Sequence, residues 1–165
     1  MASHLFGRFL VTRTRPAIVE AGMLFPRACD YFELREHTLK LAYWPGSDGE
    51  GEPVVDIDWS WIQGLRGRRV GELRIADQIG GHRNLRAIFY VAPTVLPDDP
   101  LSRIWILSVM AKKRQGFSSA DRTTFDCRRS LVVERFYSDA PLTPVKYGRG
   151  KSKKKPITRN RSRRE

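Results

Sequence analysis

Five cationic side chains fall within or just beyond three apolar runs in the middle of the chain. They are Arg74, Arg86, Lys112, Lys113 and Arg114. Guanidinium and ammonium groups gathered at one edge of a sheet would bind a phosphate, because each donates charge-assisted hydrogen bonds to an oxyanion. The same residues would also suit solvated strand ends that prevent edge-to-edge aggregation. Residue types alone support both interpretations equally.

The runs that carry these cations have the composition of β-strands. They extend over 70–75, 85–91 and 104–110, and branched and aromatic side chains dominate the second and third. Gly80 and Gly81 supply a turn after the first run, and prolines follow the second. We expect three consecutive antiparallel strands that form a meander.

Further elements are expected on both sides of the meander. Periodicity predicts a short helix over 18–25, a strand over 38–44, a helix over 56–65 and a helical or mixed segment from Ser118 towards Arg135. The apolar residues near the N-terminus indicate a first strand or a docked arm, and the tryptophans of 56–65 should pack beneath the sheet. The predicted fold class is α+β, with a small antiparallel sheet of three to four strands packed with helices.

Positive charge is concentrated at the end of the chain. Residues 146–165 contain ten Lys or Arg against one Glu, within a formal net charge of +12 for 165 residues. This composition predicts a disordered basic tail after a single domain over 1–145. Residues 1–50 of that domain would carry an additional strand and helix, or an extension peculiar to this chain. The tail would be a solubilising extension, or its cations would bind RNA or DNA phosphates in a salt-dependent, sequence-independent way. The candidates there are Lys153, Lys154 and Lys155.

Cysteine content and hydropathy indicate the cellular compartment in which the protein is expected. Cys29 and Cys127 are too few for a disulfide framework or a metal cluster, and we expect both to be core thiols in a reducing environment. No stretch approaches the roughly 20 apolar residues that span a bilayer. We therefore expect a cytoplasmic protein without a cofactor.

Three motifs occur in an order that resembles the RelE/ParE superfamily of type II toxin–antitoxin toxins, particularly its HigB-like, phage-derived branch. They are ELR at 72–74, RAIFYV at 86–91 and IWILSVMAKKRQ at 104–115. In that family a strand ending in ELR precedes a strand with an arginine before an apolar run. A third strand then leads into a KK-x-Q type sequence and a final helix. The similarity covers roughly residues 55–137.

The resemblance implies a toxin that enters the ribosomal A site and cleaves mRNA without a metal, and that a cognate antitoxin neutralises. A ribose 2′-OH attacks the adjacent phosphate, so the reaction needs a base, cations and a proton donor. By position, Arg86 with Lys112, Lys113 and Arg114 would hold the phosphate, and Arg74 ranks second.

Proton transfer requires other residues. His82, in the turn beside Arg83, and Tyr137, near Arg135, are the catalytic candidates, and Arg74, Arg83 and Arg135 would contact RNA. The alternative interpretations are an exposed turn histidine and a tyrosine that closes the core. Two other functions stay open, namely a non-catalytic member of the fold that binds nucleic acid or protein, and ParE-like inhibition of DNA gyrase.

Overall fold

A five-stranded sheet lies at the centre of the computed structural model, which describes residues 9–47, 55–93, 96 and 101–137. The elements follow the order β1 (Phe9–Arg13), α1 (Arg15–Leu24), α2 (Ala28–Leu39), η1 (Lys40–Tyr43), β2 (Asp58–Trp61), η2 (Arg66–Arg68), β3 (Val70–Ile75), β4 (Leu85–Val91), β5 (Ser102–Ala111), α3 (Ser119–Val132) and η3 (Val133–Tyr137). The sheet order is β1-β5-β4-β3-β2. Strands β2 to β5 are antiparallel neighbours, and β1 pairs with β5 in parallel. The predicted α+β class and meander are confirmed.

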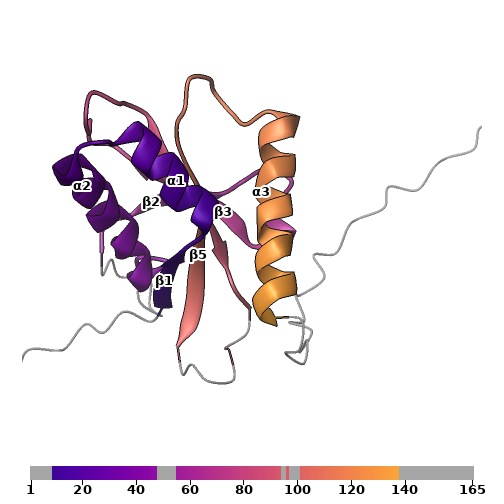
Figure 1. Cartoon of the computed structure of the whole chain (residues 1–165). Helices are drawn as coiled ribbons and strands as arrows, with labels where there is room; N and C mark the ends of the chain where they lie inside the picture. Colours follow the sequence, from indigo (N-terminus) through magenta and orange to yellow (C-terminus); the bar gives the residue numbers. More distant parts are fainter. Residues whose placement is uncertain (1–8, 48–54, 94–95, 97–100, 138–165) are drawn as a thin grey trace, which may run out of the picture.

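Helices cover both faces of this sheet. Because strand side chains alternate, Leu73 and Phe89 point to the face that α1 and α2 cover, whereas Val70 and Ile88 point to α3. The three layers are visible in Figure 1. Two apolar cores result, one on each face, and β4 is buried along almost its whole length. This double burial explains why β4 is a continuous apolar run from Ala87 to Val91.

The helices that enclose the sheet have local sequence signals. Helix α1 has a proline in its first turn and buries Ala17 and Ala21. At the start of α3, the Asp121 N–H donates to Ser118 Oγ at 3.0 Å, and the Ser118 N–H donates to the Asp121 carboxylate at 3.0 Å. This capping box fixes the helix start that the sequence predicted.

Two predicted elements were wrong. The segment 38–44, predicted to be a strand, forms the end of α2 and the 3-10 turn η1. The prediction rested on the alternation of Leu39, Leu41 and Tyr43, but only Leu41 is buried, so these residues do not form the buried face of a strand. The predicted helix over 56–65 contains β2 followed by a turn. Trp59 and Trp61 pair with β3 and share one face, so their spacing follows the two-residue period of a strand. Both pack beside Trp44 on the core that faces α1 and α2, as expected of the tryptophans.

Residues 9–47 are part of the fold. Strand β1 is a sheet member, and α1 and α2 bury side chains in the core, so this region supplies an additional strand and helices, which is one of the two alternatives expected for it. Cys29 and Cys127 are exposed, which corrects their expected place in the core. Among the described helices, none has the length and apolar composition needed to cross a bilayer. The predicted tail at 146–165 lies outside the described residues.

Candidate functional site: a basic pocket around Glu72

A carboxylate on β3 lies at the centre of the predicted cation cluster. Glu72 is 9% exposed, and three cations approach it. Arg74 Nη1 lies 3.1 Å from Glu72 Oε1, Arg86 Nε lies 3.2 Å from Oε2, and Lys112 Nζ lies 3.8 Å from Oε2. Three of the five predicted phosphate ligands therefore meet at one acidic side chain.

Sheet register explains this meeting. Glu72 and Arg74 are two residues apart on β3, so they point to the same face. Arg74 pairs with Arg86 on β4, and Arg86 pairs with Met110 on β5. Just past β5, the Lys112 N–H donates to the Asn84 carbonyl at 2.9 Å, which holds Lys112 beside the start of β4. The cations come from three adjacent strands and converge because the strands are in register.

The cluster opens into a cavity of about 450 Å³, which we call the basic pocket. Its walls come from β3, from the start of β4 and from the segment after β5. They comprise Glu72, Arg74, Asn84, Arg86, Lys112, Lys113, Arg114, Gln115 and Gly116. Lys113 and Arg114 are exposed at this pocket, so they are accessible to an anion in solution. Five cations and one carboxylate line the pocket, which therefore carries an excess of positive charge.

Arg74 differs from the other cations because it has a second acidic partner. Its Nη2 lies 2.8 Å from Asp58 Oδ1, and its Nη1 donates to Ser60 Oγ at 2.8 Å. Hydrogen bonding to Arg74 lowers the pKa of Asp58, and the same bond raises the pKa of Arg74. Arg74 thus ties β2 to β3, which fits its second rank as a phosphate ligand.

Arg86 and Glu72 form an ion pair in which one polar atom of each side chain lacks a hydrogen bond. Arg86 Nε and Glu72 Oε2 are both buried, and neither has a hydrogen-bond partner although they lie 3.2 Å apart. A buried donor and acceptor that lack hydrogen bonds are costly. Arg86 Nε is therefore a buried donor without a hydrogen bond at the wall of the pocket.

The expected proton-transfer residues lie elsewhere. His82 Nε2 is 3.0 Å from the Leu24 carbonyl, and its ring packs edge-on against Phe25 on the α1 side. The Tyr137 hydroxyl accepts a hydrogen bond from Trp105 Nε1 at 2.9 Å, and Tyr137 is buried. Neither residue lines the basic pocket. For Tyr137 the core interpretation fits the structure.

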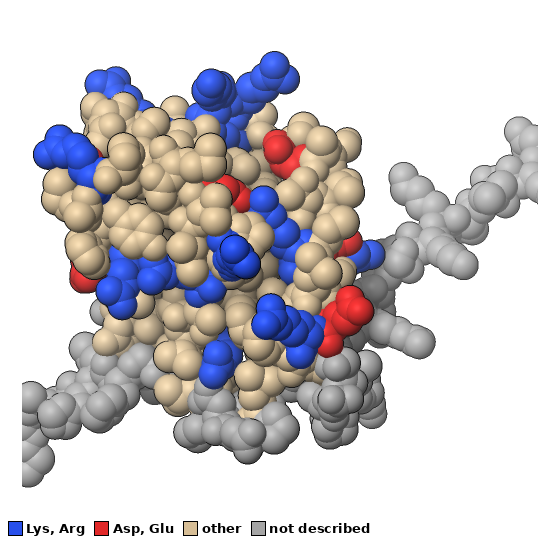
Figure 2. Space-filling model, in the orientation of Figure 1, with Lys and Arg blue, Asp and Glu red and all other residues tan. Residues whose placement is uncertain are grey.

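The expected RNA contacts outside the pocket are scattered. Arg83 donates to Gln78, and Arg135 lies over the ring of Phe136 beyond α3. Lys153, Lys154 and Lys155 lie outside the described residues. On the face seen in Figure 2, Lys and Arg side chains are widespread, and Asp and Glu are few. Such a surface provides general attraction for a polyanion, whereas the basic pocket provides a defined site.

Glu72 is the site residue that sequence reasoning missed. It is part of the ELR motif, but residue type gave no reason to place it against Arg86 and Lys112. The available signal was a carboxylate between Val70 and Leu73 in a run that is otherwise buried. A charge in such a position requires a partner.

Comparisons with protein-family models, with curated proteins and with solved structures found no match for this chain. Function therefore has to be inferred from the basic pocket and the fold that forms it.

Proposed function

We propose that the chain is a toxin of the RelE/ParE type, close to its HigB-like branch, which cleaves mRNA on the ribosome, needs no metal and is neutralised by a cognate antitoxin. The observation that carries the proposal is the basic pocket, in which Arg86 and Lys112 contact Glu72 while Lys113 and Arg114 also line the walls. The fold supports it as well. Family toxins place one or two helices between their first and second strands, and α1 and α2 occupy that position here.

The cations of the pocket would stabilise the transition state of phosphoryl transfer. When a 2′-oxygen attacks phosphorus, negative charge develops on the non-bridging oxygens. Arg86 has a planar fork suited to two of these oxygens, and Lys112 and Lys113 supply compact charges beside it. Charge stabilisation by protein cations is the task that a metal performs in other nucleases.

Glu72 is the base that the pocket supplies. Its Oε2 contacts Arg86 Nε at 3.2 Å and Lys112 Nζ at 3.8 Å. A bound phosphate competes for these two cations and leaves Oε2 free to accept the proton of the 2′-OH. The 2′-oxygen then bonds to phosphorus, and the bond to the 5′-oxygen breaks. A lysine ammonium of the pocket protonates the leaving 5′-oxygen, which gives a 2′,3′-cyclic phosphate and a 5′-hydroxyl.

A second candidate is an RNA-binding protein of the same fold that does not cleave. It is favoured by the positions of His82 and Tyr137, neither of which lines the basic pocket. Binding to a phosphate backbone requires cations alone, and the pocket has them. Replacement of Glu72 separates the two candidates, because a base is necessary for cleavage and dispensable for binding.

The test is induction of the intact chain in bacteria, with growth measurement and mapping of mRNA 5′ ends. We expect growth arrest and cuts in phase with codons, and we expect Arg86→Ala with Lys113→Ala to abolish both. Arg35→Ala with Lys40→Ala is the matched control, because it removes one exposed Arg and one exposed Lys from outside the pocket. Circular dichroism of each purified variant checks the fold.

The variant Glu72→Gln distinguishes the outcomes further. We expect it to lose cleavage and to retain binding to a short RNA in a filter assay. Full toxicity of the double pocket variant would refute the phosphate site. RNA binding without cuts in the parent would favour the binding protein, and loss of DNA supercoiling would favour gyrase inhibition.

A further inference from the structure

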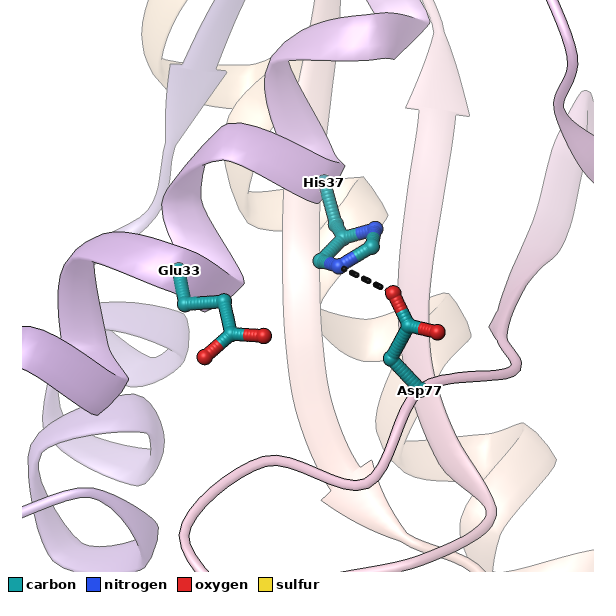
Figure 3. Close-up of side chains that lie close together, drawn as sticks. All are labelled: Glu33, His37 and Asp77. Carbon is teal, nitrogen blue, oxygen red and sulfur yellow. Dashed lines mark ion pairs between the residues drawn. The ribbon is translucent and has the colours of Figure 1, made fainter.

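A cluster of three metal-ligating side chains lies between α2 and the segment after β3. Glu33 and His37 come from α2, and Asp77 comes from two residues past the end of β3. Figure 3 shows the imidazole and both carboxylates directed toward a common space. His37 Nε2 lies 3.2 Å from Asp77 Oδ2, and one potential ligand atom from each residue lies within 4.8 Å of the others.

Helix geometry and packing bring this cluster together. Glu33 and His37 are four residues apart, so they project from the same side of α2. The His37 side chain is only 19% exposed, and its Nε2 is directed toward Asp77. Asp77 is 64% exposed, and Glu33 is also exposed, so ions in solution reach both carboxylates.

The ion pair between His37 and Asp77 leaves the negative charge of Glu33 without a partner within this cluster. Asp77 has the His37 ring as a partner, whereas the Glu33 carboxylate faces a second acidic group within 4.8 Å of its own oxygen. Like charges at this spacing repel unless a cation lies between them. A divalent ion compensates both carboxylates and takes the neutral imidazole as a ligand.

We propose that Glu33, His37 and Asp77 bind one divalent transition-metal ion of the zinc class, with water as a fourth ligand. Imidazole nitrogen together with carboxylate oxygen suits Zn²⁺, whereas Mg²⁺ and Ca²⁺ prefer oxygen ligands throughout. Tetrahedral bonds of about 2.0–2.2 Å place ligand atoms roughly 3.3 Å apart. His37 and Asp77 already have this spacing. Glu33 reaches it by rotation of an exposed side chain.

Such an ion would connect two parts of the chain that are about 40 residues apart. It would fix α2 to the connection between β3 and β4, three residues after Arg74. None of its ligands lines the basic pocket, so the ion has no part in phosphate chemistry there. The proposal stands independently of RNA cleavage.

The test is titration of the purified full chain with ZnCl2 by isothermal calorimetry, together with thermal unfolding with and without zinc. The protein carries Cys29→Ser and Cys127→Ser, since both thiols are exposed and thiolates are zinc ligands that would compete in the titration. We expect one Zn²⁺ per chain and a higher Tm with zinc. We expect His37→Ala, Asp77→Asn and Glu33→Gln each to weaken binding at least tenfold and to abolish the increase in Tm.

The control is Glu36→Gln, which makes the same exchange at an exposed position of α2 outside the cluster, and which we expect to leave zinc binding unchanged. Asp77→Asn also breaks an ion pair and lowers the Tm without metal. The deciding quantity is therefore the change in Tm that zinc causes. Zinc affinity that survives His37→Ala, an equal effect of MgCl2, or an equal loss in Glu36→Gln would overturn the proposal.

Discussion

Glu72 holds the pocket cations together, so its removal should destabilise the empty protein and improve the pocket as an anion site. The side chains of Glu72, Arg86 and Lys112 are 12%, 16% and 14% exposed. After Glu72→Ala, two largely buried cations lose their counter-ion. Loss of one partner from a buried ion pair costs about 3–5 kcal/mol. Because the pocket opens to water, we expect a value near the lower end, about 3 kcal/mol.

A free anion should restore much of this loss in the variant. Phosphate would take the place of the carboxylate beside Arg86 Nε, a buried donor that lacks a hydrogen bond in the parent. A ligand present at 100 times its Kd stabilises the folded state by about 2.7 kcal/mol. We expect phosphate to stabilise the variant clearly more than the parent, in which Glu72 competes for the same cations.

The assay is urea unfolding of parent and Glu72→Ala in sodium phosphate and in sodium chloride of equal ionic strength. Chloride controls for general screening, which weakens repulsion among the cations in any salt. Equal stability of the variant and the parent in chloride would refute the role of Glu72 as the counter-ion of Arg86 and Lys112. Equal stabilisation of both proteins by phosphate relative to chloride would refute the competition between Glu72 and the anion.

Three further perturbations test the fold around the pocket. Ser118→Ala removes the capping box of α3 and should lower the free energy of unfolding by about 1 kcal/mol in urea, whereas an effect no larger than that of Ser119→Ala would contradict the cap assignment. Gly71→Ala places a Cβ 2.7 Å from the ring of the buried Phe89 and should cost about 1–3 kcal/mol, while Gly67→Ala, which meets no atom within 4 Å, should cost less. Burial would raise the pKa of Asp126, but hydrogen bonds from two arginines outweigh it and hold this pKa below its ordinary 3.8. A lowered folded-state pKa contributes stability above the unfolded value and loses it as pH falls through the folded value. Asp126→Asn should therefore reduce stability at pH 7 by up to about 1 kcal/mol and change it little well below pH 3.8, and a difference that is constant with pH would be inconsistent with this linkage.

The sequence by itself determined the central strands and the start of the last helix. Runs such as 85–91 are apolar, branched and bounded by turn residues, and this pattern depends only on neighbours in the chain. The capping box at Ser118 is equally local. The cations at the strand ends could also be identified, because a meander brings the ends of consecutive strands to predictable edges of the sheet.

Some local patterns were ambiguous until packing decided them. The alternation of large apolar residues over 38–44 is typical of a strand, although the segment forms the end of α2 and η1. The tryptophans of β2 have a spacing that fits a helical face as well as a strand. A short run of apolar residues fits both the roughly 3.6-residue period of a helix and the two-residue period of a strand. Burial against neighbouring elements decides which of the two forms. Parallel pairing of β1 with β5 joins residues more than 90 positions apart, which no local window contains.

Only the tertiary structure decided which charged groups meet. Glu72 contacts Arg86 and Lys112 because β3, β4 and β5 align in one register, and that register depends on the whole sheet. The same folding directs His82 toward α1 and Tyr137 into the core, away from the basic pocket. Residue type indicates what a side chain can do, whereas long-range packing determines which partner it reaches.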